Sequence, residues 1–325
     1  MALDKSVNPA SMNASMRTEA ETLPTTLSFS EKFSAFKEFS KTNVMMLVLM
    51  MTFLGYLMGQ PLNQLVDLSH LSLTLLGTWL LGAGSTSLNQ LQERHIDRKM
   101  NRTQNRPLPS QRLHLTEAWL FIGLTLMTGA IVLWEINPIV FTLGLLTVVT
   151  YNLGYTLWWK RAWAFGAIPG ALPGALPILM GYAAISPAPF SNEALFIFLL
   201  LFFWQMPHFW SLAIRFKDDY RQGGIPTLPV TYGVERTVQQ IVLWTLGYIG
   251  LAIMGHLFLK ASSVYLFIVV PTSLKVLWEL FEYAKDTSKK RWLRFFLWVN
   301  FSLLLYLAAA VVDRWKPIVW DLIWV

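Results

Sequence analysis

The sequence predicts an all-α integral membrane protein, built as a bundle of about nine transmembrane helices. Of its 325 residues, 54% are hydrophobic and only 14% are charged, a composition typical of membrane proteins. Apolar runs of about 20 residues recur along the chain, and each is long enough to cross a hydrocarbon core about 30 Å thick. Lys-rich and Arg-rich loops also alternate with loops that are poor in both, as the positive-inside rule predicts for a multi-pass protein.

Nine apolar runs meet this length criterion. In chain order, the expected spans are 43–60, 70–90, 115–134, 138–157, 165–186, 193–213, 238–259, 262–282 and 293–312. The fifth span places Pro169, Pro173 and Pro177 at intervals of four residues among glycines. Small residues let membrane helices approach closely, so this span either packs tightly against a neighbour or lines an apolar groove.

The distribution of positive residues predicts that the N-terminus lies in the cytoplasm. Lys and Arg gather before the first span and in the loops after the second, fourth, sixth and eighth spans, whereas the opposite side offers only Lys260, Arg314 and Lys316. With an odd number of spans, the C-terminus then lies outside. The net charge of +7 largely reflects this asymmetry, which disfavours a nucleic-acid partner.

Residues 1–35 are expected to form a flexible tail ahead of a transmembrane domain, 36–325. The tail is rich in Ser, Thr, Met and Asn and has no sustained apolar run. It lacks a signal-peptide core, and its acidic residues argue against a mitochondrial transit peptide, so a bacterial plasma (inner) membrane is favoured over an organellar one. The chain has no cysteine, which excludes disulfides, thiolate metal sites and thiol nucleophiles.

The end of the second span contains a strip of oxygen-bearing side chains. Asn89, Glu93 and Asp97 recur every four residues, so they lie on one face of a helix. Magnesium needs only one or two protein carboxylates and takes its other ligands from water and phosphate, so this strip is a candidate metal site. Candidate diphosphate ligands follow it directly: Arg98, Arg102 and Arg106. The alternative is a solvated helix end with surface ion pairs.

A second polar segment follows the sixth span. His208, Ser211, Arg215 and Asp219 are spaced by three, four and four residues, which predicts one shared helical face and a repeat of the first strip. Asp218 and Asp219 are candidates for a second metal or water-positioning site, and Asp219 is favoured because it shares that face. Arg215 and Lys217 are further candidate diphosphate ligands. The alternative is a loop acid paired with one of these cations.

Lys160 and Arg161 follow the fourth span, in YTLWWKR. They either mark topology or clamp phosphate oxygens, Lys as a point charge and Arg through two hydrogen bonds. Beside two acidic clusters at the same membrane boundary, the second interpretation gains weight.

Five segments in this order resemble the UbiA superfamily of intramembrane prenyltransferases, and within it the branch that farnesylates haem. They are IDRKMNRTQNRPLP, YTLWWKR, GALPGALPILMGY, WQMPHFW and RFKDDYRQGGIPTLP. The resemblance runs from about residue 40 to the end, with the strong motifs within 89–233. The superfamily's first acidic motif, N-x-x-x-D-x-x-x-D, falls on Asn89, Glu93 and Asp97, with Glu93 where Asp is usual. Its usual second aspartate pair is absent, as in the haem-modifying branch.

The resemblance implies a reaction and its partners. Farnesyl diphosphate, held by Mg²⁺ and cationic residues, would lose diphosphate, and the allylic cation would add to a vinyl group of protohaem IX (haem B). Water would then capture the resulting cation to give haem O. In this scheme Asn89, Glu93, Asp97 and Lys160 are catalytic. Haem O would serve terminal oxidase assembly, so haem A synthase, oxidase assembly factors and the lipid bilayer are expected partners.

His208 is the candidate haem contact. It follows Pro207, which can kink a helix and aim a side chain into a cavity. Iron ligation, a propionate contact and proton transfer are all open, and a buried, hydrogen-bonded histidine is the alternative.

Two other functions compete with this one. The first is a prenyltransferase of the same superfamily that acts on a quinone precursor or chlorophyllide. The second is an anion transporter, which needs access from both membrane faces, whereas the candidate ligands here gather on one.

Overall fold

The predicted fold class is confirmed by the computed structural model, which describes residues 28–323. Within that range nine helices are long and apolar enough to cross a membrane. Eight are regular: α3 (Thr42–Gly59), α4 (Leu68–Asp97), α5 (Leu115–Ile136), α8 (Ala167–Ile185), α9 (Asn192–Arg215), α12 (Gly233–Phe258), α13 (Ser263–Lys285) and α14 (Lys289–Ile323). The ninth, Pro138–Ala162, joins α6 (Pro138–Val149), a π-helix η1 (Thr150–Trp159) and α7 (Lys160–Ala162). Each predicted span coincides with one of these helices.

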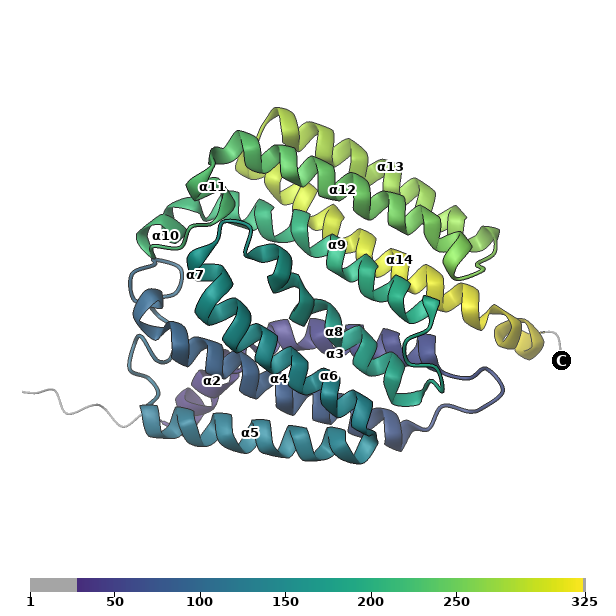
Figure 1. Ribbon diagram of the computed structural model, residues 1–325, viewed down its shortest axis with the longest axis horizontal. Coiled ribbons are helices and arrows are strands. Elements are labelled where there is room, and N and C mark those ends of the chain that lie inside the picture. Colours follow the sequence, from purple (N-terminus) through teal and green to yellow (C-terminus); the bar gives the residue numbers. More distant parts are fainter. Residues whose placement is uncertain (1–27, 324–325) are drawn as a thin grey trace, which may run out of the picture.

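The helices run side by side as one bundle with two distinct ends (Figure 1). Two short helices, α10 (Lys217–Gln222) and α11 (Leu228–Thr231), lie beside α7 at the left end in this view, whereas the C-terminus lies at the right. We refer to the left end as the α7 end. Because α4 and α9 both finish there, the two polar segments predicted from the sequence come to the same end of the bundle.

A helix that the sequence analysis did not predict, α2 (Phe29–Phe39), precedes the first span. Ser28 and Glu31 form a capping box at its start, and Ala35 and Phe39 are fully buried against α4 and α5. The expected flexible tail, 1–35, is therefore wrong for 29–35, because the tail was bounded by composition and the apolar residues of α2 are interspersed with polar ones rather than forming a sustained run. Residues 1–27 lie outside the described part of the chain.

The proline-rich fifth span, α8, packs against α3 at backbone distance. A Cβ atom added to Gly181 would lie 1.9 Å from the carbonyl oxygen of Thr52, and one added to Gly55 would lie 2.0 Å from that of Ile178. Only glycine permits such an approach, so the tight-packing interpretation of this span is confirmed. This contact fixes α3 within the bundle, and with it the polar residues at its start.

The π-helix η1 is the second feature that the sequence did not predict. Thr156 donates a hydrogen bond to the carbonyl oxygen of Tyr151, and Asn152 Nδ2 donates one to Ser85 Oγ of α4 at 2.7 Å. π-Helical turns are rare and often lie at functional sites. This one leads directly into Lys160 and places Thr156 against α4.

Candidate active site

The predicted strip at the end of α4 lies inside the protein. Asn89, Glu93 and Asp97 share one face of an unbroken helix and are 2%, 3% and 0% exposed. Two carboxylates at this depth require partners, because a buried unpaired charge is strongly destabilising. A solvated helix end is therefore excluded.

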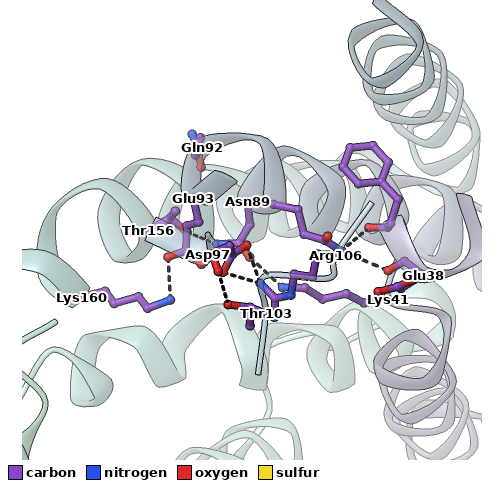
Figure 2. A network of polar contacts seen from close by, with 12 residues as sticks. Glu38, Lys41, Asn89, Gln92, Glu93, Asp97, Thr103, Arg106, Thr156 and Lys160 are labelled. Atoms are coloured by element: carbon purple, nitrogen blue, oxygen red, sulfur yellow. Dashed lines mark hydrogen bonds and ion pairs between the residues drawn. The ribbon is translucent and has the colours of Figure 1, made fainter. Parts of the chain in front are cut away.

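Each of these three side chains is bonded to a cation from a different segment (Figure 2). Lys160 Nζ donates to Glu93 Oε1 at 2.6 Å. Arg106 Nη1 lies 2.9 and 2.8 Å from the two carboxylate oxygens of Asp97. Lys41 Nζ donates to Asn89 Oδ1 at 2.7 Å. We call these six side chains the α4 cluster; it brings three basic side chains to two carboxylates and one amide.

The surrounding segments hold the cluster in place. Asn89 Nδ2 donates to Thr156 Oγ1 of η1 at 3.0 Å, so both ends of the Asn89 amide are engaged. Thr103 Oγ1 donates to the carbonyl oxygen of Asp97 at 3.0 Å, which folds the following loop back over the helix end. That loop returns Arg106 to Asp97, nine residues away. The cluster and its threonine contacts thus join the start of α3, α4, η1, α7 and the loop after α4.

Lys41 is the member that the sequence analysis treated only as a topology marker. It lies between α2 and α3 in a left-handed backbone conformation, φ 50°. From α4, Gln90 and Ser87 donate to the carbonyl oxygen of Phe39, and Thr86 donates to that of Ser40, so this junction is tied to the cluster. Burial lowers the pKa of Lys41 to about 7, and the Arg106 guanidinium acts in the same direction. In the sequence, a lysine just before an apolar span looks like any positive-inside marker.

The other predicted cations make different contacts. The Arg102 guanidinium stacks 5.0 Å from the ring centroid of Phe216 and 5.9 Å from that of Tyr220. Arg98 Nε donates to the carbonyl oxygen of Pro109 at 3.4 Å. Arg161 donates to the carbonyl oxygens of Thr156 and Gln92, at 3.0 and 3.2 Å. Of the predicted diphosphate ligands, the structure thus brings Arg106 and Lys160 to the acids, whereas Arg98, Arg102 and Arg161 contact backbone carbonyls or aromatic rings of neighbouring segments.

The predicted helical face from His208 to Asp219 is not formed. Helix α9 ends at Arg215, and Phe216 (φ −113°, ψ 29°) separates it from α10. Asp218 points into solvent, since its side chain is 83% exposed and pairs with Arg221 at 3.1 Å. Asp219 is half-buried in the first turn of α10, so of the two acids it remains the candidate for a second metal or water-positioning site. The prediction of one continuous face is wrong because the chain leaves the helix at Phe216.

His208 lies among aromatic rings at the boundary between α9 and α14. Its ring centroid is 4.8 Å from that of Trp204 and 4.9 Å from that of Phe296. Nδ1 is buried and has no hydrogen-bond partner within residues 28–316, whose side chains the structure describes. Arg215, about two turns further along α9, stacks against the rings of Phe216 and Trp292.

Comparison with known proteins identifies the family. The UbiA prenyltransferase family matches residues 48–301, most of the membrane domain. The chain belongs to this family. It is 45% identical to a protoheme IX farnesyltransferase of Bdellovibrio bacteriovorus, over 81% of this chain and 90% of that protein. It is 34% identical to one of Leptospira biflexa, over 86% of this chain and 99% of the other.

Solved structures agree on the fold of this UbiA family member. Digeranylgeranylglyceryl phosphate synthase superposes with a TM-score of 0.72 at 18% identity, over 88% of this chain and 99% of that one. A UbiA homologue from Archaeoglobus fulgidus bound to GPP and Mg²⁺ superposes with a TM-score of 0.62 at 18% identity, over 85% and 99%. At this identity the likeness shows the fold alone. Family membership and fold together make the chain a membrane-embedded prenyltransferase.

The donor atoms of the α4 cluster fit the magnesium that this enzyme family implies. Within the described residues, no three His, Asp or Glu side chains are grouped as a metal site. Glu93 and Asp97 nevertheless supply the one or two carboxylates that magnesium needs, and Asn89 adds an amide oxygen. Glu93 replaces the usual Asp of the family motif, and its longer side chain still reaches across to Lys160 of α7.

Proposed function

We propose that this protein transfers the farnesyl group of farnesyl diphosphate to a vinyl group of protohaem IX, with addition of water, to give haem O. The observation that supports prenyl transfer most strongly is the buried α4 cluster, where two carboxylates and three cations meet at one helix end. The acceptor rests on the curated relatives, which are protoheme IX farnesyltransferases.

The cluster suits a metal-bound diphosphate because its basic side chains are bonded to the same side chains that would hold the metal. Once the metal binds, these basic side chains can bond phosphate oxygens instead. Asn89, Glu93 and Asp97 would hold Mg²⁺, and Lys160, Arg106 and Lys41 would then turn to phosphate oxygens. When bound, the metal neutralises charge on the departing diphosphate. The three cations do the same from fixed, largely buried positions, where electrostatic stabilisation is stronger than in water.

The reaction balances as follows. The bond between farnesyl C1 and the diphosphate oxygen breaks, and both electrons leave with diphosphate. The π electrons of the haem vinyl group form the new carbon–carbon bond, which leaves a cation next to the porphyrin ring. Water adds to that cation, and its proton passes to diphosphate or solvent. An apolar surrounding within the bilayer limits earlier capture of the farnesyl cation by water.

We further propose that the active site faces the cytoplasm of a bacterial cell. The cluster and the Arg-rich loops lie together at the α7 end (Figure 1), and by the positive-inside rule that end is cytoplasmic. The described chain begins at this end and finishes at the other, as nine spans require. The bacterial relatives support the plasma membrane. Haem A synthase and oxidase assembly factors remain proposed partners.

The test is a reconstituted assay. Purified protein in lipid nanodiscs is incubated with haem B, farnesyl diphosphate and Mg²⁺, and products are identified by mass. We expect haem that has gained one farnesyl group and one hydroxyl group, and no such product from an Asp97→Asn control. Parallel reactions offer a quinone precursor or chlorophyllide as acceptor. Prenylation of either, with no haem product, would overturn the proposed acceptor.

A further inference from the structure

A ladder of aromatic rings joins α9 to α14 and is not used by the diphosphate chemistry. From Trp204, successive ring centroids lie 4.8 Å apart to His208, then 4.9 Å to Phe296 and 5.2 Å to Trp292. The interplanar angles are 36°, 34° and 26°. At its end, the Arg215 guanidinium lies 5.8 Å from the Trp292 centroid. We call these four rings and Arg215 the ring ladder.

The polar atoms of the ring ladder have unused bonding capacity. His208 Nδ1 and Trp292 Nε1 are buried and form no hydrogen bond with the described residues. Buried polar atoms are nearly always paired, so two unpaired nitrogens in one ladder require an explanation. By contrast, the indole nitrogen at the Trp204 end of the ladder is paired, because Trp204 Nε1 donates to the carbonyl oxygen of Val299 at 3.0 Å.

Arg215, the cation of the ring ladder, also differs from the arginines of α14 in its ion pairing. On α14, Arg291 pairs with Glu282 at 2.7 Å and Arg294 with Glu279 at 2.7 Å. Within residues 28–316, Arg215 has no carboxylate at ion-pair distance and stacks only on rings. It therefore keeps its full capacity to bind a carboxylate through two hydrogen bonds.

We infer that the ring ladder is the binding site of the tetrapyrrole, with the porphyrin plane against the half-buried rings and a propionate carboxylate bonded to Arg215. This inference rests on the proposed function, because it assumes a haem acceptor. Flat aromatic surfaces suit a porphyrin, and a planar guanidinium suits its carboxylates. Arg215 then binds the acceptor instead of the diphosphate, the role that the sequence suggested.

The position of the ladder brings acceptor and donor to the same end of the bundle. Phe216 lies between two guanidinium groups, 5.9 Å from that of Arg215 and 5.0 Å from that of Arg102. Arg102 belongs to the loop that also returns Arg106 to Asp97. The Arg215 end of the ladder is thus linked through Phe216 and Arg102 to the loop that bonds the α4 cluster.

The experiment measures haem binding without turnover. Wild-type protein in nanodiscs is titrated with haem B, without farnesyl diphosphate, and binding is followed by the Soret band. The same titration is made with Arg215→Gln and with Arg221→Gln, a control on exposed Arg221. A second ligand, haem B dimethyl ester, has no free carboxylate. Mg²⁺-dependent binding of farnesyl thiodiphosphate, a slow-reacting analogue, is measured on every sample to verify folding.

We expect Arg215→Gln to weaken haem B binding about tenfold, the effect of losing one charge-assisted hydrogen bond, and to leave dimethyl ester binding unchanged. Arg221→Gln should match wild type with both ligands. Equal haem B affinity in Arg215→Gln and wild type would contradict this binding site while leaving the proposed function intact. If the variant lost the same affinity for haem B and for its dimethyl ester, the site would also be contradicted, because the loss would then come from altered packing and not from a missing carboxylate contact. Failure of wild type to bind haem B at all would overturn both proposals.

Discussion

Helices α4 and α9 reach the same end of the bundle with similar polar residues but use them differently. On α4 the helix stays unbroken to Asp97, and its polar face is buried and bonded to residues from several other segments. On α9 the helix breaks at Phe216, so its acidic residues fall on α10 and Asp218 faces solvent. What remains on α9 is a histidine among rings and an arginine that has no carboxylate partner within residues 28–316.

The difference indicates a division of labour between the two helices. An unbroken helix with ligands every four residues holds them at fixed separations, which suits a metal and its diphosphate. An aromatic surface ending in a guanidinium suits a large planar acid. Each prediction below changes a side chain of the α4 cluster or of the segment from α9 to α10, and asks whether binding of the diphosphate donor or of the haem acceptor fails.

The largest effect is expected for Asp97→Asn. The amide keeps the size of the side chain but removes the charge that Arg106 neutralises and that magnesium would use. We expect kcat for haem farnesylation to fall about a thousandfold, as when a principal electrostatic contact is lost. Product formation is measured by mass, with elution of the purified protein as the folding control. Activity within a few-fold of wild type would remove Asp97 from the site.

Lys160→Met should cost about a hundredfold in kcat, because one cation that stabilises the leaving diphosphate is lost. The same change leaves Glu93 buried without its partner, which can destabilise the fold. The double variant Glu93→Gln, Lys160→Met therefore serves as a second test, since both charges are removed together. Transfer restored by the double variant would show that Lys160 only compensates Glu93.

Lys41→Met tests the residue that the sequence analysis missed. We expect the KM for farnesyl diphosphate to rise about tenfold, because one charge-assisted contact to phosphate is lost, while the KM for haem stays constant. Lys37→Met, at an exposed position on α2, is the matched control. Steady-state kinetics with each substrate varied in turn separates the two constants. Similar values for both lysine variants would place Lys41 outside the diphosphate site.

His208→Ala should affect binding of the haem acceptor and not of farnesyl diphosphate. Loss of the ring removes stacking with Trp204 and Phe296, so we expect the haem KM to rise about fivefold and the farnesyl diphosphate KM to stay constant. The same two-substrate kinetics measure both. A rise in the farnesyl diphosphate KM alone would assign His208 to the donor side.

The smallest effect is expected for Asp218→Asn. Within the described residues this exposed carboxylate pairs only with Arg221, and such surface pairs contribute little. Farnesylation should stay within about twofold of wild type. Asp219→Asn, measured in the same assay, should lose more farnesylation activity than Asp218→Asn. The opposite order would make Asp218 the candidate metal or water-positioning residue instead of Asp219.

The sequence predicted the nine spans and the buried acids because both depend on local periodicity. Apolar length marks each span, and Asn89, Glu93 and Asp97 share a face in any unbroken helix. Arg106 and Lys160 were candidates from their positions after the acidic strip and after the fourth span, but their pairing with particular acids is a tertiary contact. Lys41 was missed because its position depends on the unpredicted helix α2. The break at Phe216 was missed because nothing in RFKDDY resembles a helix stop.

The central claim is that the α4 cluster holds a magnesium-bound prenyl diphosphate. The most direct measurement is the binding of farnesyl thiodiphosphate to wild type and Glu93→Gln, titrated with Mg²⁺ and again with EDTA. We predict that wild type binds tightly only with Mg²⁺ and that Glu93→Gln loses most of this dependence. Equal, Mg²⁺-dependent binding by both proteins would contradict the account.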